Sequence, residues 1–165
     1  MNPQVNITYA EAISSIRKML AVYAKRAKDK QGNMLFQDFT ISTAEEAACK
    51  VYVQFAVNSV ISDILQFVQG VTTTPAGISF RAENKRWESY SDRDFSAALA
   101  EHIHTFSALY AISKIFQSVA PALVKAIEED AMGAKRDIHD MFFFKYPSKP
   151  STKEPEDITA IVAPT

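Results

Sequence analysis

The sequence has few cysteines and few glycines. Its 165 residues include one cysteine, Cys49, and four glycines. A single cysteine cannot form a disulfide within the chain, which fits a reducing compartment. No base stands near Cys49 in the sequence, so we expect a buried, unreactive thiol. With so few glycines, a Gly-rich loop that cradles phosphate is hard to build.

A strong charge of either sign is also missing. The net charge is -1 and 22% of the residues are charged, which argues against a protein that mainly coats nucleic acid. The uncharged stretch from Val51 to Ser62 is too short, and too interrupted by polar residues, to span a bilayer. The first residues lack the basic and apolar regions of a signal peptide. We expect one domain with a real core and no membrane association.

Residues 43–69 are predicted to form a long helix that is apolar on two opposite sides. Ser42 and Glu45 form a capping box at its start, and Gly70 is its expected stop. At about 100° per residue, one side carries Ala47, Ala48, Val51 and Phe55, with Cys49 beside them, and the other carries Val53, Val57, Val60, Ile61, Ile64 and Val68. Such a helix must be covered on both sides, by its own chain or by another subunit. The pattern therefore indicates self-assembly.

Three further helices are predicted around it. Thr8 and Glu11 form a capping box before a helix over residues 9–28. A third helix begins near Ser91, and a fourth begins at Pro121, a residue that suits a first helical turn. We expect a core that includes Phe55, Leu99, Phe106 and Leu109.

The strand-like signal lies between the second and third helices. Residues 71–74 are β-branched, Pro75 to Gly77 form a turn, and Ile78, Phe80 and Ala82 alternate with polar residues. This predicts a β-hairpin or long loop inserted at about 71–90. Trp87 at its base either folds back onto the helices or is exposed as an interface anchor.

The last nineteen residues differ in composition from the rest. Four of the seven prolines fall in residues 147–165, which predicts an extended C-terminal arm after a helical domain of residues 1–146. Within the arm, residues 158–162 are β-prone. They could pair with the edge of another chain's sheet, or the arm could be a loose terminus. The expected fold is mainly α: a four-helix bundle with a long central helix, the hairpin or loop, and this arm.

One motif resembles a metal site. Glu101-His102-Ile103-His104 contains the Glu-x-x-His spacing of half a di-iron site. Glu101 and His104 fall opposite the apolar stripe of the predicted helix, however, while His102 lies on that stripe and is expected to be buried. No second such pair exists, because Arg136 stands where a glutamate would precede His139. We expect no catalytic, cofactor or metal site, and no enzyme.

Two segments resemble the head–tail connector (head-completion or adaptor) proteins of tailed bacteriophages. One runs from Ile78 to Trp87 and continues to Asp94-Phe95, and the other runs from Met141 to Pro147, where a helix stops in aromatic and basic residues. Both look like connector-like proteins of phages and prophages of Bacteroides-type bacteria. The order of helices, hairpin and polar tail is also similar.

The resemblance implies a structural virion protein, assembled in the bacterial host cytoplasm, that forms an oligomeric ring between portal and tail. The ring would bind the portal protein and a tail or stopper protein, and double-stranded DNA would pass through it without sequence recognition. No cofactor is implied. The expected protein-interface residues are Val57, Ile61, Ile64, Thr74, Pro75, Trp87, Phe143, Phe144, Ile158, Ile161 and Val162. The alternatives are a helical protein-binding adaptor, monomeric or dimeric, and a bundle enzyme with a metal site.

Overall fold

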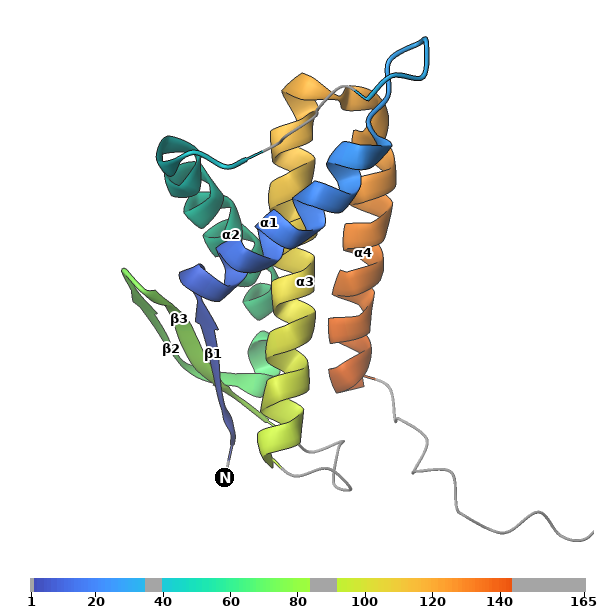
Figure 1. Ribbon diagram of the computed structural model, residues 1–165. Helices are drawn as coiled ribbons and strands as arrows, with labels where there is room; N and C mark the ends of the chain where they lie inside the picture. Colours follow the sequence, from blue (N-terminus) through green and yellow to red (C-terminus); the bar gives the residue numbers. More distant parts are fainter. Residues whose placement is uncertain (1, 35–39, 84–91, 144–165) are drawn as a thin grey trace, which may run out of the picture.

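The computed structural model in Figure 1 describes residues 2–34, 40–83 and 92–143. These residues form four α-helices, a short 3-10 helix and a small three-stranded sheet, so the prediction of a mainly helical fold is confirmed. The elements in chain order are β1 (Gln4–Thr8), α1 (Tyr9–Arg26), α2 (Thr43–Asp63), η1 (Leu65–Phe67), β2 (Val68–Thr74), β3 (Gly77–Ala82), α3 (Asp92–Val119) and α4 (Pro121–Phe143).

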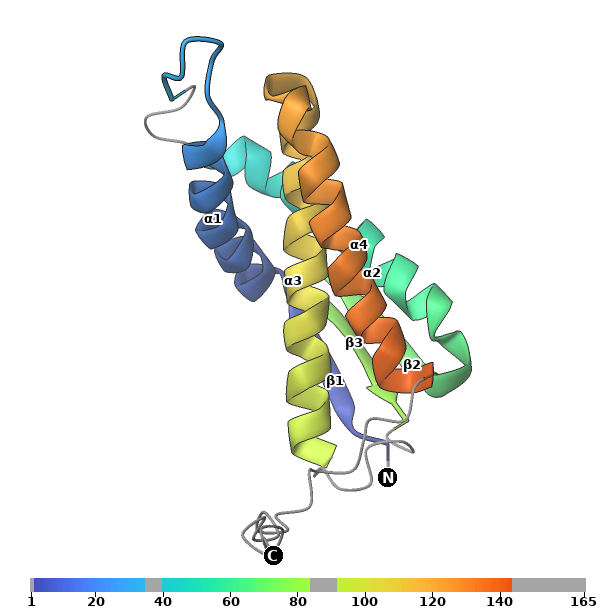
Figure 2. The ribbon, with the colours of Figure 1, turned by 90° about the vertical axis from the view of Figure 1, so that its right-hand side faces the viewer.

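The centre of the molecule is α3, which packs against α1, α2, α4 and β1. It spans 28 residues, against 21 for α2. In Figure 2, α1 lies on the left of α3, and the end of α2 reaches the right-hand edge of the molecule. The long helix predicted over residues 43–69 corresponds to α2, but the helix at the centre of the described structure is α3. Because α3 is enclosed by several elements, apolar residues around most of its circumference are buried: Phe95, Leu99, Ile103, Phe106, Ala108, Leu109, Ile112 and Phe116.

The helix α2 ends six residues earlier than predicted. Its last residue is Asp63, Ile64 closes its final turn, and η1 leads directly into β2. Gly70, the predicted helix stop, lies instead within β2 at a φ of 63°, a conformation that favours glycine. The pairing of β2 with β3 shifts register just after it, between Gln69 and Thr72.

The sheet has the order β1–β3–β2, and both pairs are antiparallel. The pair β2–β3 occupies the place of the predicted hairpin. The strand β1 was not predicted, although its sequence has the period of two that strands require: Val5 and Ile7 are buried, whereas Gln4 and Asn6 are exposed. The strand β1 packs against the lower part of α3 (Figure 1), whereas Gln4, Asn6 and Arg81 on the other face of the sheet are exposed.

The predicted helix starts are confirmed. The Thr8 hydroxyl accepts a hydrogen bond from the Glu11 backbone N–H at 3.3 Å at the start of α1. At the start of α2, Ser42 and Glu45 form the full capping box. Pro121 is the first residue of α4. Local side-chain chemistry thus fixes where three of these helices begin.

Three polar contacts tie α4 to α1 and α2. The Tyr23 hydroxyl in α1 donates a hydrogen bond to Asp130, and burial together with that carboxylate raises the Tyr23 pKa to about 12. Lys135 Nζ lies 2.8 Å from both Asp63 Oδ2 and Ser59 Oγ at the end of α2. These contacts fix the end of α2 against α4.

Candidate protein-interaction surface

One side of α2 is apolar and is not covered by the other described elements. Ala44, Ala48, Val51 and Phe55 follow each other at intervals of four, three and four residues, so they form a single stripe along the helix, which we call the outer stripe. Phe55 is 67% exposed and Val51 is 53% exposed. In Figure 1 the first turns of α2 stand clear of the other elements at the upper left. A clustered apolar surface of this kind is typical of a contact site.

The opposite side of α2 is buried against the rest of the chain, chiefly α3. Val57, Ile61 and Ile64, three predicted interface residues, belong to this side, with exposed fractions of 0%, 7% and 0%. Their assignment to a subunit interface is therefore wrong, and the assignment of Phe55 to the core is wrong for the same reason. The periodicity showed that α2 has two apolar sides, but only tertiary packing decides which of them the chain covers.

Cys49 lies on the buried side of α2, not beside Val51 as predicted. It is 1% exposed. Burial raises the pKa of its thiol, and the negative charges of Glu45 and Glu46 add to the effect. The thiol therefore stays protonated, as expected for an unreactive cysteine.

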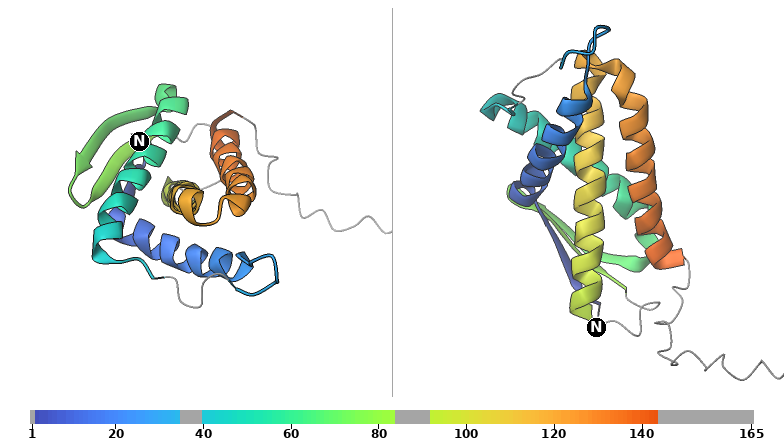
Figure 3. Two further views of the ribbon diagram at one scale, coloured as in Figure 1. Left: turned by 90° about the horizontal axis from the view of Figure 1, so that it is seen from above. Right: turned by 45° about the vertical axis from the view of Figure 1, so that its right-hand side comes forward.

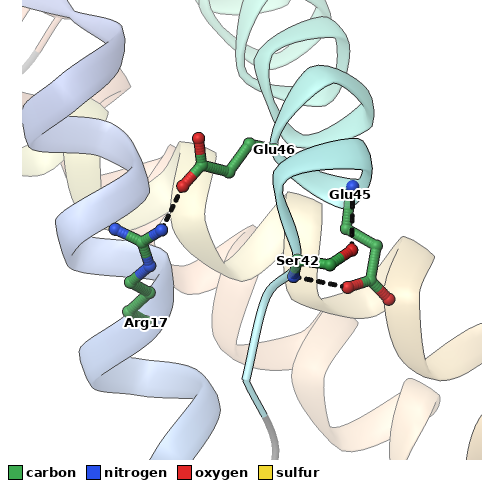
Figure 4. Close-up of polar contacts among 4 residues, drawn as sticks. All are labelled: Arg17, Ser42, Glu45 and Glu46. Atoms are coloured by element: carbon green, nitrogen blue, oxygen red, sulfur yellow. Dashed lines mark hydrogen bonds and ion pairs between the residues drawn. The ribbon is translucent and has the colours of Figure 1, made fainter.

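A groove of about 580 Å³ lies between α1, the first half of α2 and the turn of the sheet. It is lined by Thr8, Tyr9, Ala10, Ile13, Arg17, Glu46, Lys50, Pro75 and Ala76. Arg17 and Glu46 form an ion pair across it, and Figure 4 shows this pair beside the capping box of Ser42 and Glu45. The groove combines apolar lining residues with the charged Arg17, Glu46 and Lys50, so it could bind a ligand that presents both apolar and charged groups.

The β2–β3 turn forms one wall of that groove. Thr74 and Pro75, both predicted interface residues, are exposed there. The Tyr9 backbone N–H donates a hydrogen bond of 2.9 Å to the Ala76 carbonyl oxygen, which holds the turn against the start of α1. Figure 3, seen from above, shows the sheet, α2 and α1 following one another around α3. The turn is thus an exposed but anchored part of the surface.

The end of α4 forms an aromatic cluster with η1. The Phe67 ring stacks on Phe142 with 5.2 Å between centroids, and meets the edge of Phe143 at 5.3 Å. Phe142 is buried, whereas Phe143 is half-buried and also stacks on His139 at 4.1 Å. The predicted interface residues Trp87, Phe144, Ile158, Ile161 and Val162 lie outside the described residues.

His102 and His104 are both half-buried, although the prediction placed only His102 on the core side. The side chain of His104 is 14% exposed, and its Nε2 lies 3.5 Å from Glu11 Oε2. Burial lowers the His104 pKa, and the Glu11 carboxylate opposes this only in part. Among the described residues, His104 Nδ1 and the buried Ser107 Oγ have no hydrogen-bond partner. The prediction assumed that α3 has one core face, whereas α1 also packs against α3 and brings Glu11 close to His104.

The described residues contain no group of three His, Cys, Asp or Glu side chains that could hold a metal ion. Within the same residues, no helix has the length and apolar character needed to cross a membrane. Comparison with known protein families, curated proteins and solved structures found no match to this chain. The function therefore has to be argued from the surfaces described above.

Proposed function

We propose that this protein is a structural, non-enzymatic subunit that assembles with copies of itself, and that the outer stripe of α2 packs against another copy. The observation that carries the proposal is the exposure of Phe55 and Val51, in line with Ala44 and Ala48, on the side of α2 opposite the core.

The energetic argument for assembly rests on these two large side chains. Removing a Phe or Val side chain from water contributes about 1.5–3 kcal/mol each. No charged residue lies between Val51 and Ser62, so covering this part of the helix desolvates no ionised group. The alanines at the start of the stripe present little bulk, which lets a neighbouring element approach closely.

The specific form that we propose is a head–tail connector ring of a tailed bacteriophage. In that form the subunit binds a portal protein on one side and a tail or stopper protein on the other, and the ring continues the DNA channel in the virion. The resemblance of residues 78–87 and 141–147 to connector proteins supports this assignment. The near-neutral charge of the chain supports it too, because a strongly basic channel wall would retain DNA.

A protein-binding adaptor is the second candidate, and the groove beside the β2–β3 turn favours it. Its apolar lining residues and the Arg17–Glu46 pair could receive a peptide of a different protein. An adaptor of this kind would act as a monomer or a dimer. The mass of the protein in solution and in particles distinguishes the two proposals.

The test of self-assembly is sedimentation of the purified chain, alone and, where a neighbouring gene encodes a portal protein, together with that protein. We expect a high-mass species that the double variant Val51→Ser/Phe55→Ser reduces by about tenfold or more. Met132→Ser is the matched control, because Met132 is an apolar residue of α4 that is 60% exposed. A high-mass species that both variants leave unchanged would contradict the role of the outer stripe.

The connector assignment has its own test. Mass spectrometry of purified virions should find this chain in a fixed ratio to the portal protein. Its absence from virions, together with neighbouring genes that encode no portal or capsid protein, would refute the assignment while leaving self-assembly open to the sedimentation test.

A further inference from the structure

The outer edge of β2 is a strand edge to which no described strand is paired. In the sheet order β1–β3–β2 only one side of β2 faces β3. Residues 69–74 of β2 are all exposed, so neither face of the strand is covered by the helices. From Thr72 to Thr74 its register with β3 is regular. This part of β2 therefore offers backbone N–H and C=O groups in the geometry that another strand requires.

This edge lacks most of the features by which proteins prevent strand addition. Edge strands are usually protected by charged side chains, by proline or by bulges. The sequence of β2, VQGVTTT, contains no charged residue and no proline. Its one irregularity lies between Gln69 and Thr72, before the regular part. An unprotected edge with β-branched side chains is suited to receive a partner strand.

The segment Ile158–Val162 of the same sequence has the composition of such a partner. Its residues are Ile, Thr, Ala, Ile and Val, four of which are β-branched. It carries no charge, so it would meet the uncharged β2 without repulsion between like charges. Five residues are enough to pair with Thr72–Thr74 and extend past the turn.

The position of the last described residue, at the end of α4, determines which sheet edges this segment can reach. The helix α4 ends at Phe143, and the contacts of Phe142 and Phe143 with Phe67 place that end beside the start of β2. Fourteen residues, 144–157, separate this end from Ile158 in the sequence, and three of them are prolines. A proline-rich stretch of this length would span about 43 Å if it were extended. That is about twice the length of β2, so it is long enough for the segment to reach the same edge on a neighbouring copy.

We propose that Ile158–Val162 of one copy adds to the sheet of the next copy as a fourth strand, along the outer edge of β2. Each copy then gives one arm and receives one arm, which is a head-to-tail contact that forms a closed ring when the rotation between copies closes. The inference rests on the proposed self-assembly and names a second contact for it, separate from the outer stripe of α2.

The direct test is cross-linking between two full-length variants mixed after purification. One carries Ala160→Cys, and the other carries Thr72→Cys or Thr73→Cys, whose side chains point to opposite faces of β2. A short bis-maleimide should join each pair into a covalent dimer, with a higher yield for the position that shares a face with residue 160. The matched control is Gln66→Cys, an exposed residue just before β2, which should remain at the background set by the buried Cys49.

A second pair of variants tests the backbone pairing in the complete chain. Ile161→Pro removes a backbone N–H and prevents regular strand pairing, so it should lower the cross-link yield by about tenfold. Ala163→Pro, just outside the segment, should retain the yield. The proposal is overturned if no pair cross-links between chains, or if Ile161→Pro cross-links as well as its control.

Sedimentation of the same samples separates the two proposals. High-mass species without cross-links would refute the arm contact and leave self-assembly standing. A chain that stays monomeric both alone and with the portal would refute both.

Discussion

His104 lies where α1 packs against α3, and its burial disfavours the protonated form of its ring. Its pKa is lowered in the folded chain, whereas the unfolded chain takes up the proton near pH 6.5. Below that pH the unfolded state binds more protons than the folded state, so stability falls as pH falls from about 6.5 towards the folded pKa. The nearby Glu11 carboxylate reduces this loss without cancelling it.

The expected result is a urea midpoint that is lower at about pH 5 than at about pH 7.5, with a smaller difference in His104→Gln. His139→Gln is the control, because the His139 side chain is 48% exposed on α4. Asp29 and Glu45 also have lowered pKa values, through hydrogen bonds with Asn33 and Ser42. The stability that these carboxylates contribute is lost as they become protonated, which happens at a lower pH than the range compared here. Equal pH dependence in His104→Gln and the parent chain would contradict this account.

At the scale of elements, the contact of β1 with β3 depends on Gly77. A Cβ atom at this position would lie 2.1 Å from the Ile7 carbonyl oxygen and 2.9 Å from the Thr8 Cα. Backbone atoms cannot yield as a flexible side chain can, so β1 would have to move away. Gly77→Ala should therefore lower the free energy of unfolding by about 1–3 kcal/mol.

Gly133→Ala is the matched control for that change. Apart from the adjoining backbone of α4, no atom lies within 4 Å of a Cβ at Gly133, an exposed residue in the interior of that helix. Alanine is favoured over glycine in a helix by about 0.8–1 kcal/mol, so this variant should be more stable than the parent. Thermal and denaturant unfolding measure both effects. If the two alanine variants change stability in the same direction, the close approach of β1 to Gly77 is refuted.

The sequence was most informative where a local signal acts alone. Ser42 with Glu45 and Pro121 mark helix starts through hydrogen bonds or backbone geometry that need no distant partner, and these predictions are confirmed. The end of α2 was misplaced because the apolar residues that follow Asp63 would fit a helix as well as a strand. In the structure they form η1 and the start of β2. The strand β1 was missed because alternation over only five residues is a weak signal. Its pairing with the distant β3, which fixes it as a strand, is not visible in the sequence.

At the scale of the whole molecule, the same limit applies to the candidate site. Periodicity alone identified two apolar sides on α2, but the position of α3 decides that Val57 and Ile61 are core and that Phe55 is surface. The groove beside Pro75 could not be predicted, because it brings together α1, α2 and the turn from three separate parts of the chain. Contacts that join distant segments carry no signature in a single sequence.

The central claim is that another copy covers the outer stripe of α2. Hydroxyl-radical footprinting of the full-length chain, read out by mass spectrometry at Phe55, tests it most directly. In dilute monomer Phe55 should be oxidised readily, as its exposed fraction of 67% requires, and in the assembled high-mass species or in virions it should be protected by about tenfold. Met132 should be oxidised equally in both states. Equal oxidation of Phe55 in monomer and assembly would contradict the account.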